Sequence, residues 1–220
     1  MGRTGRDRDR RPARGAASKE PRRRLLVVCE GKCTEPEYFN ALKRHLKNPL
    51  MELQIHKERG DPKKIVEMAK KAQSEANERA SLQHDSWLGF DEVWCVFDRD
   101  DHEHFDAAVT KAEDNNFLLA VSNPCFELWL LLHLREPPGA RHRDDLKPLL
   151  RAELGHDYGK HPPFEVLKSG LDDAIRRAER LDQEAKERGD PPRKNPSTGV
   201  YRLVRAMRSD GPCHPKDPQP

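Results

Sequence analysis

Residues 94–102 read Trp94-Cys95-Val96-Phe97-Asp98-Arg99-Asp100-Asp101-His102. The apolar half of this stretch has no polar interruption, which is typical of a strand buried on both faces of a parallel sheet. Three carboxylates then follow within four positions, at the point where the strand leaves the core. Two interpretations are open for these acids: a divalent metal site, or a solvated turn whose acids cap the next helix.

Strand and helix patterns alternate four times between residues 25 and 134. Short apolar or alternating runs predict strands over 25–29, 51–56, 93–97 and 117–121. Helical spacing predicts helices over 34–47, from 61, from 103, and from 122 to 134. This alternation predicts an α/β fold with a four-stranded, mostly parallel sheet and helices on both faces.

Two of these helices have start signals. Thr34-Glu35-Pro36-Glu37 fits a capping box, with Thr34 as N-cap and Glu37 at the third helical position. Asp61-Pro62 has the favoured order of a cap followed by proline.

The chain becomes polar and helical from residue 137 onward. Helices are predicted over 144–154, 165–188 and 198–207, and no strand pattern appears in this half. We therefore expect an α/β domain over 24–135, with an appended helical C-terminal region over 136–208 packed on it. Residues 1–23 and 209–220 are expected to be disordered.

Positive charge is concentrated at the N-terminus. Residues 1–24 carry ten basic and three acidic side chains, whereas the remainder has a net charge of −4. Such an arm, which includes Arg22, Arg23 and Arg24, can bind a polyanion such as nucleic acid in a salt-sensitive way. A solubilising extension is the alternative.

Other classes of protein fit the sequence poorly. No run approaches the roughly 18 apolar residues of a membrane span, so we expect a cytoplasmic protein. The five cysteines are an odd number without a CxxC pair, which favours buried, reduced thiols over disulfides or a structural zinc site.

The carboxyl ends of parallel strands lie at one edge of a sheet, where ligands of open α/β folds bind. Glu30 follows the first predicted strand, and Asp98 and Asp100 follow the third. Three carboxylates from two strands favour a metal site over a solvated turn. Gly31 would permit a tight turn or the close approach of a phosphate.

Four motifs, in the same order along the chain, resemble those of known protein families. Glu30 and the Asp98-Arg99-Asp100 run resemble the Toprim fold of topoisomerases, primases and small nucleases. More closely, residues 30–39, 97–102, 122–130 and 195–198 resemble the RloB-like family, whose bacterial members are associated with restriction-modification loci and abortive-infection defence. The resemblance spans about residues 24–207.

The Toprim resemblance implies that Asp98 and Asp100 hold Mg²⁺, with Mn²⁺ as a possible substitute. Glu30 would be a metal ligand or the general acid or base of phosphodiester chemistry. The implied activity is that of a Mg²⁺-dependent nuclease on RNA, tRNA among the options, or on DNA. The implied context is anti-phage defence with a possible partner protein.

Several neighbouring side chains are further candidates. Glu127 is an isolated acid in an apolar helix, so it is predicted to participate in the site or to cap its own helix. Lys32 and Arg99 could contact a phosphate, and Asp101 and His102 could support the metal ligands or begin the next helix. His133 is interpreted as structural.

Two other functional classes compete with the nuclease. One is a non-catalytic nucleic-acid-binding or scaffold protein of a defence system that keeps the Toprim shape. The other is a phosphatase or glycosyltransferase that also uses a DxD motif, although the motif of dehalogenase-type phosphatases follows the first strand. The complete set of Glu30, Asp98 and Asp100 favours the nuclease.

Overall fold

The computed structural model describes residues 23–49, 51–57, 61–99, 104–155, 159 and 161–208. In chain order these residues form β1 (Arg23–Cys29), α1 (Thr34–Leu46), β2 (Met51–Lys57), α2 (Pro62–Gln83), the 3-10 helix η1 (Ser86–Leu88), β3 (Glu92–Asp98), α3 (Phe105–Asp114), β4 (Leu118–Asn123), α4 (Glu127–Leu134), α5 (Arg143–Leu154), α6 (Phe164–Leu167), the 3-10 helix η2 (Lys168–Gly170), α7 (Leu171–Glu187), β5 (Ser197–Thr198) and α8 (Val200–Arg208). The segments predicted to be disordered lie outside the described residues, apart from residue 23.

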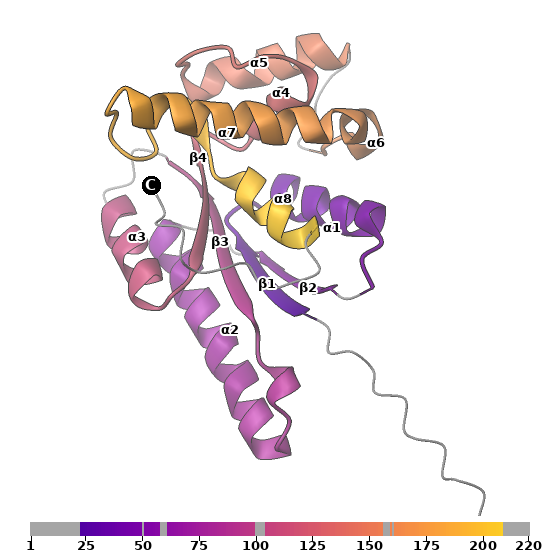
Figure 1. The fold of residues 1–220 in the computed structure, drawn as a ribbon, viewed down its shortest axis with the longest axis vertical. Helices are drawn as coiled ribbons and strands as arrows, with labels where there is room; N and C mark the ends of the chain where they lie inside the picture. Colours follow the sequence, from indigo (N-terminus) through magenta and orange to yellow (C-terminus); the bar gives the residue numbers. More distant parts are fainter. Residues whose placement is uncertain are drawn as a thin grey trace, which may run out of the picture.

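The sheet has the order β2-β1-β3-β4-β5, with the first four strands parallel and β5 antiparallel to β4. The chain leaves β1 through α1 toward β2 on one side, and it leaves β3 through α3 toward β4 on the other side (Figure 1). The connections therefore diverge between β1 and β3. In an open α/β sheet this divergence opens a crevice at the carboxyl ends of the two strands.

Apolar side chains cover both faces of the sheet. Alternation along β1 sends Leu25, Val27 and Cys29 into a core shared with α1 and α4–α8. Leu26 and Val28 enter a second core, which is shared with α2 and α3. The predicted α/β class is thus confirmed, and the uninterrupted apolar strands are explained by burial on both faces.

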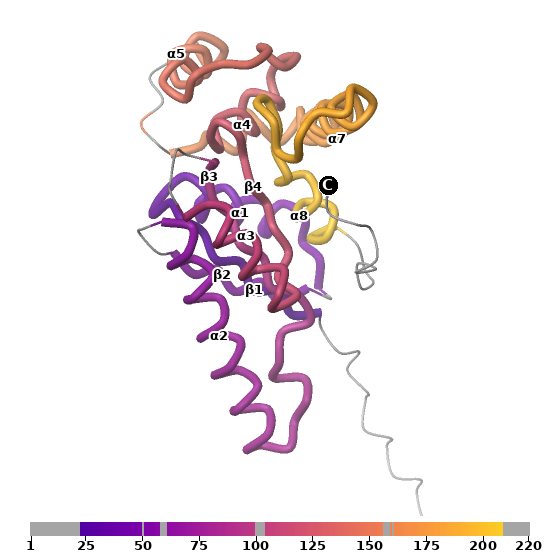
Figure 2. The backbone as a smooth tube through the Cα atoms, turned by 90° about the vertical axis from the view of Figure 1, so that its left-hand side faces the viewer, coloured from indigo at the N-terminus to yellow at the C-terminus, as the bar shows by residue number. Residues whose placement is uncertain are grey.

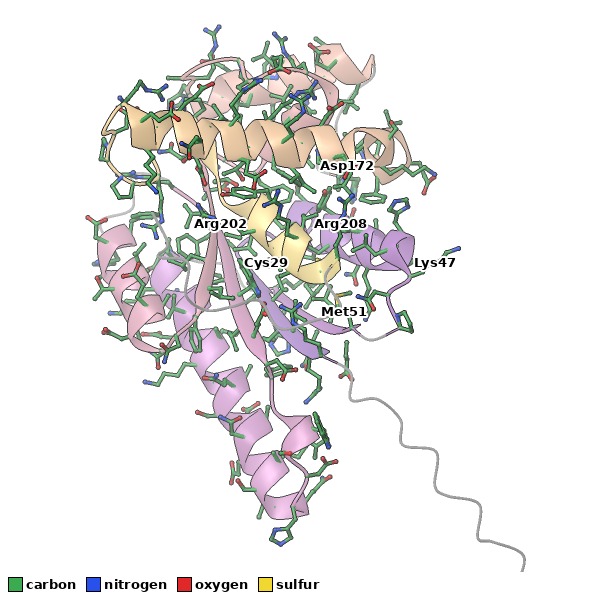
Figure 3. The ribbon with its side chains drawn as sticks, in the orientation of Figure 1. Cys29, Lys47, Met51, Asp172, Arg202 and Arg208 are labelled. Atoms are coloured by element: carbon green, nitrogen blue, oxygen red, sulfur yellow. The ribbon has the colours of Figure 1, made fainter. Side chains whose placement is uncertain are left out.

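The C-terminal helices stack beyond the end of the sheet, as Figure 1 and Figure 2 show for α4, α5 and α7. The apolar residues of α4, Leu128 to Leu132, are buried on all sides because this helix lies between the sheet and its neighbours. Two ion pairs of 2.5 Å join α8 to α7. Arg208 pairs with Asp172, both of which are labelled in Figure 3, and Arg202 pairs with Asp182. None of the described helices combines the length and apolarity needed to cross a membrane.

A fifth strand was not predicted. The two-residue strand β5 pairs with the end of β4, and the buried hydroxyls of Ser122 and Thr198 lie 2.9 Å apart. Thr198 also accepts a hydrogen bond from the backbone of Val200 and so caps α8. A strand of two residues has no periodicity that a sequence pattern could reveal.

Two predicted helix starts were wrong. Ser122 and Asn123, predicted to begin a helix, instead end β4, and α4 begins at Glu127. The predicted capping box of α1 is the other. Cys33, not Thr34, is the N-cap of α1 because Thr34 is already helical, and the Cys33 side chain makes no capping hydrogen bond. Glu37 instead contacts His161 at 2.9 Å. The Asp61 cap of α2 is confirmed by its hydrogen bond from Lys64 N.

The predicted helix over 165–188 is interrupted. It is divided into α6, η2 and α7, and Gly170 lies against the end of α4. A Cβ atom at residue 170 would overlap the backbone carbonyl of His133. The close approach of two backbones therefore breaks the helix where the sequence pattern is continuous.

His133 belongs to a buried polar network. Its Nδ1 lies 2.9 Å from the Trp129 carbonyl and its Nε2 lies 3.0 Å from the Tyr38 hydroxyl. Since a carbonyl can only accept, Nδ1 carries the proton and Tyr38 donates to Nε2. Burial lowers the pKa of His133 to about 4, which keeps this side chain neutral in the core. Its contacts match the structural interpretation.

Gly170→Ala is expected to lower the free energy of unfolding by about 1 to 3 kcal/mol, because the added methyl group forces two backbones apart. Gly159→Ala is the control, since a Cβ there meets no atom within 4 Å. Urea titration of both variants measures the difference. Equal stability of the two variants would contradict the close packing of η2 on α4.

Candidate functional site

Parallel pairing of β1 with β3 brings Glu30 and Asp98 together. Glu30 N donates to the carbonyl of Val96 at 3.0 Å, which extends the strand pairing past the end of β1. The Glu30 carboxylate in turn accepts a hydrogen bond from Asp98 N at 3.2 Å. Both acids therefore lie at the crevice between the diverging strand connections.

These acids line a pocket of ≈ 470 Å³, which is in the size range of ligand sites. Its walls come from the loop after β1, the end of β3, the starts of α1 and α4, and the start of α5. The lining residues are Glu30, Gly31, Lys32, Cys33, Thr34, Glu35, Asp98, Cys125, Phe126, Glu127, Arg143, Asp144 and Lys147. Of the predicted site residues, Glu30, Lys32, Asp98 and Glu127 are thus brought together.

Glu35 is a member of the pocket that the sequence analysis missed. Its side chain is only 7% exposed and folds back on Gly31, where an added Cβ would overlap its carboxylate. Gly31 is therefore needed for the close approach of an acid. A signal was available, because helical spacing puts Glu35 on the same stripe as the buried Phe39 and Leu42.

The buried carboxylates disfavour one another's ionised forms. Burial, together with the charges of Glu127 and Glu30, raises the pKa of Glu35 to about 7, against hydrogen bonds from the backbone of Glu35 and Gly31 that lower it. Burial, followed by the charges of Glu35, Glu30 and Glu127, holds the pKa of Asp98 well above its usual range. Asp98 nevertheless keeps 16% of its side chain exposed and is accessible from the pocket.

Cations from the C-terminal region complete the pocket. Arg143 of α5 lies with its guanidinium 3.9 Å from the Asp98 carboxylate, and Lys147 follows one turn later. Neither residue was predicted to belong to the site. No local pattern distinguishes them from the many other basic residues, because only the packing of α5 on α4 brings them to this edge.

Other predicted residues lie elsewhere. Arg99 donates hydrogen bonds to the carbonyls of Pro192 and Arg193 at 3.1 and 3.0 Å, away from the pocket lining. Arg23 pairs with Glu92, and Arg24 binds the carbonyl of Gly89, both at the amino end of β1. The positions of Arg22, Asp100, Asp101 and His102 are outside the described residues.

A second cavity, of ≈ 210 Å³, lies between α7, β4 and the loop before β5. Its charged lining includes Asp182 paired with Arg202 and Asp190 paired with Lys194. Lys186 and Arg193 also line this cavity, so cations outnumber acids there, and the larger acidic pocket is the stronger candidate for a metal ion.

The donor chemistry of the acidic pocket fits a hard divalent ion, because Mg²⁺ binds carboxylate oxygens. Across the described residues, no group of three His, Cys, Asp or Glu side chains is arranged to hold a metal ion. Glu30 and Asp98 are the predicted ligands that the structure describes, and the third, Asp100, lies outside that part of the chain. The metal site therefore stays a prediction.

Glu35→Gln is expected to stabilise the metal-free protein at alkaline pH. Between pH 4.5 and about 7 the folded state binds more protons at Glu35 than the unfolded state, so stability falls as pH rises through this window. Glutamine does not ionise, so the Glu35→Gln variant does not lose this stability as the pH rises. We expect a gain of about 2 to 3 kcal/mol at pH 8 and a much smaller gain at pH 5.

Denaturant titration in a chelating buffer measures this difference at both pH values. Glu78→Gln is the control, because Glu78 is an exposed helical acid outside the pocket lining. A Glu35→Gln gain that is the same at pH 5 and pH 8 would exclude ionisation of Glu35 as its cause.

Comparison with known proteins tests whether the chain belongs to a known family. Searches among curated proteins and among solved structures gave no match. The family model described as RloB-like protein matches residues 25–207, which include both strands of the site and the C-terminal helices. The chain therefore belongs to the RloB-like protein family.

Proposed function

We propose that the protein is a Mg²⁺-dependent nuclease that hydrolyses phosphodiester bonds. The observation that carries this proposal is the convergence of Glu30 and Asp98 at the β1/β3 crevice, in a pocket that also contains cationic side chains. Carboxylates suit a divalent ion, and cations suit a phosphate. A nuclease of this kind would use the ion to activate water and the cations to bind the phosphate.

Each side chain has a role in this proposal. Glu30 and Asp98, together with Asp100, would hold the ion, which supplies polarisation of the phosphate and activation of water. Glu127 adds a carboxylate at the start of α4 that can orient water or a ligand, and Lys32 places a positive charge at the exposed rim. Mn²⁺ has the same preference for oxygen ligands and is the expected substitute.

RNA, with tRNA among the candidates, is the substrate that we test first, and DNA is the alternative. Family membership supports a role in bacterial anti-phage defence, with a possible partner defence protein. Both the substrate and the role are proposals.

A non-catalytic nucleic-acid-binding or scaffold role is the second candidate. It is favoured by one observation: Arg143 and Lys147 line the pocket, and cationic side chains can bind a phosphate without a metal ion. Such a protein would bind nucleic acid without turnover. Activity measurements separate the two candidates.

Asp98→Asn and Glu30→Gln are each expected to lower Mg²⁺-dependent cleavage by at least about 1,000-fold, which corresponds to about 4 kcal/mol of transition-state stabilisation. The amides keep the shape of the side chains but lose the charge that binds the ion. Cleavage of labelled tRNA, single-stranded RNA and single- and double-stranded DNA is measured with Mg²⁺, with Mn²⁺ and with a chelator.

Asp106→Asn is the control, because Asp106 is an exposed acid in the first turn of α3, outside the pocket lining. Circular dichroism tests whether each variant is folded. Nucleic-acid binding without cleavage by the wild-type protein on every substrate would favour the scaffold role.

Deleting residues 1–22, which carry eight basic and three acidic side chains, is expected to weaken nucleic-acid binding and flatten its salt dependence. Cleavage of a short oligonucleotide at saturating concentration should persist, because the proposed catalytic acids Glu30 and Asp98 lie outside the deleted segment. Replacement of the eight basic residues by glutamine at constant length separates charge from chain length. An unchanged salt slope in both variants would reduce the arm to a spacer.

A further inference from the structure

Helix α5 presents two cations to the acidic pocket. Arg143 and Lys147 are four residues apart, so they lie on the same face of the helix, and both line the pocket. The Arg143 guanidinium lies 3.9 Å from the Asp98 carboxylate, yet 43% of its side chain is exposed. This side chain can therefore contact both the acidic site and a ligand that enters from solvent.

We propose that Arg143 and Lys147 bind the backbone phosphate of a nucleic-acid strand at the acidic pocket, and that Asn195 is a positioning residue for them. This inference rests on the proposed nuclease function and adds the protein groups that would hold the phosphate. It assigns to the C-terminal helical region a direct part in substrate binding.

The charge distribution of the pocket supports this assignment. Glu30, Glu35, Asp98 and Glu127 line it from the strand ends and from the starts of α1 and α4, and these acids by themselves repel a phosphate. Arg143 and Lys147 come from a different element, α5, and bring two positive charges to the lining beside the one negative charge of Asp144 from the same helix. The forked donors of an arginine match two oxygens of one phosphate.

Asn195 fixes the backbone just before α5. Its Nδ2 donates to the carbonyl of Arg141 at 2.8 Å, and its Oδ1 accepts from Arg141 N at 3.4 Å. His142, which follows Arg141, is the N-cap of α5 and forms a reciprocal capping box with Asp145. These contacts set the position from which the Arg143 side chain extends.

The segment that carries Asn195 is itself attached to the strand ends of the site. Arg99, which follows β3, binds the carbonyls of Pro192 and Arg193, and Asn123 at the end of β4 donates to the Arg193 carbonyl at 2.6 Å. These hydrogen bonds from side chains to backbone carbonyls connect the start of α5 to the strand ends and so fix its position relative to Asp98. Arg99 contributes to this support and lies outside the lining of the pocket.

Arg143 could instead serve only to neutralise Asp98. In that case its removal would change stability and leave the affinity for a strand and the salt dependence of that affinity unaltered. A phosphate contact makes the opposite prediction, because each cation that binds a phosphate contributes to the slope of log Kd against log salt.

The test measures binding of fluorescein-labelled 20-nucleotide single-stranded RNA and DNA by anisotropy, with Ca²⁺ in place of Mg²⁺, from 50 to 300 mM salt (roughly the range over which phosphate contacts alter affinity). The variants of the full chain are Arg143→Ala, Arg143→Lys, Lys147→Ala and Asn195→Ala. Arg151→Ala is the matched control, since Arg151 is an exposed arginine on the same helix outside the pocket lining. Urea titration verifies that each variant is folded.

Arg143→Ala and Lys147→Ala are each expected to weaken binding about tenfold or more and to reduce the salt slope by about 0.7. Arg143→Lys should recover the slope and part of the affinity, while Arg151→Ala binds as wild type does. Folded Arg143→Ala and Lys147→Ala variants with wild-type affinity and slope would overturn the proposal.

Asn195→Ala should reproduce the loss of affinity and slope of Arg143→Ala, and the double variant should add little to either single variant. Additive losses would show that Asn195 acts independently of Arg143 and would overturn its positioning role. Binding that depends on Arg143 without any cleavage would leave this inference standing and reject the nuclease. Cleavage by an Arg143→Ala variant with wild-type affinity would overturn this inference and leave the nuclease proposal standing.

Discussion

The parallel pairing of β1 with β3 is the constraint on which the rest of the structure depends. It places Glu30 within hydrogen-bonding distance of the Asp98 backbone, and it sets the point where connections diverge to opposite sides of the sheet. Burial of β1 on both faces fixes its register, since a shift by one residue would exchange its two apolar cores. The position of the acids is therefore determined by packing that takes place far from them.

The same packing forces carboxylates into a partly buried pocket, where they oppose one another's ionisation. The pKa of Glu35 is raised, which means that burial disfavours its ionised form. A neutral side chain of the same shape would occupy its place at a lower cost in folding free energy. Such groups reduce stability, and proteins usually keep them where a ligand or a reaction requires charge. The cations of α5 offset part of this repulsion, as the pairing of Arg143 with Asp98 shows. Acids and cations from separate regions thus form one electrostatic unit.

Sequence patterns predicted most of the elements because burial imposes a regular period. The apolar runs ending at Cys29 and Phe97 predicted the site strands, and strand-end logic placed Glu30 beside Asp98. The patterns failed where contacts between distant segments decide the local structure. β5 is too short to have a period, and Gly170 interrupts a helix because it packs on the backbone of α4. The capping box at Thr34 was overridden by a helix that begins one residue earlier.

The sequence by itself determined the α/β class, the two buried strands and the acids that follow them, because these depend on hydrophobic period and on nearest neighbours along the chain. Only the tertiary structure decided which charges share the pocket. Glu35 enters it through its close approach to Gly31, while Arg143 and Lys147 enter it because α5 packs on α4. Arg99 was directed instead to the loop that supports α5. The sequence around a charged side chain does not identify its partner, because that partner is brought close by the folding of residues far away in the chain.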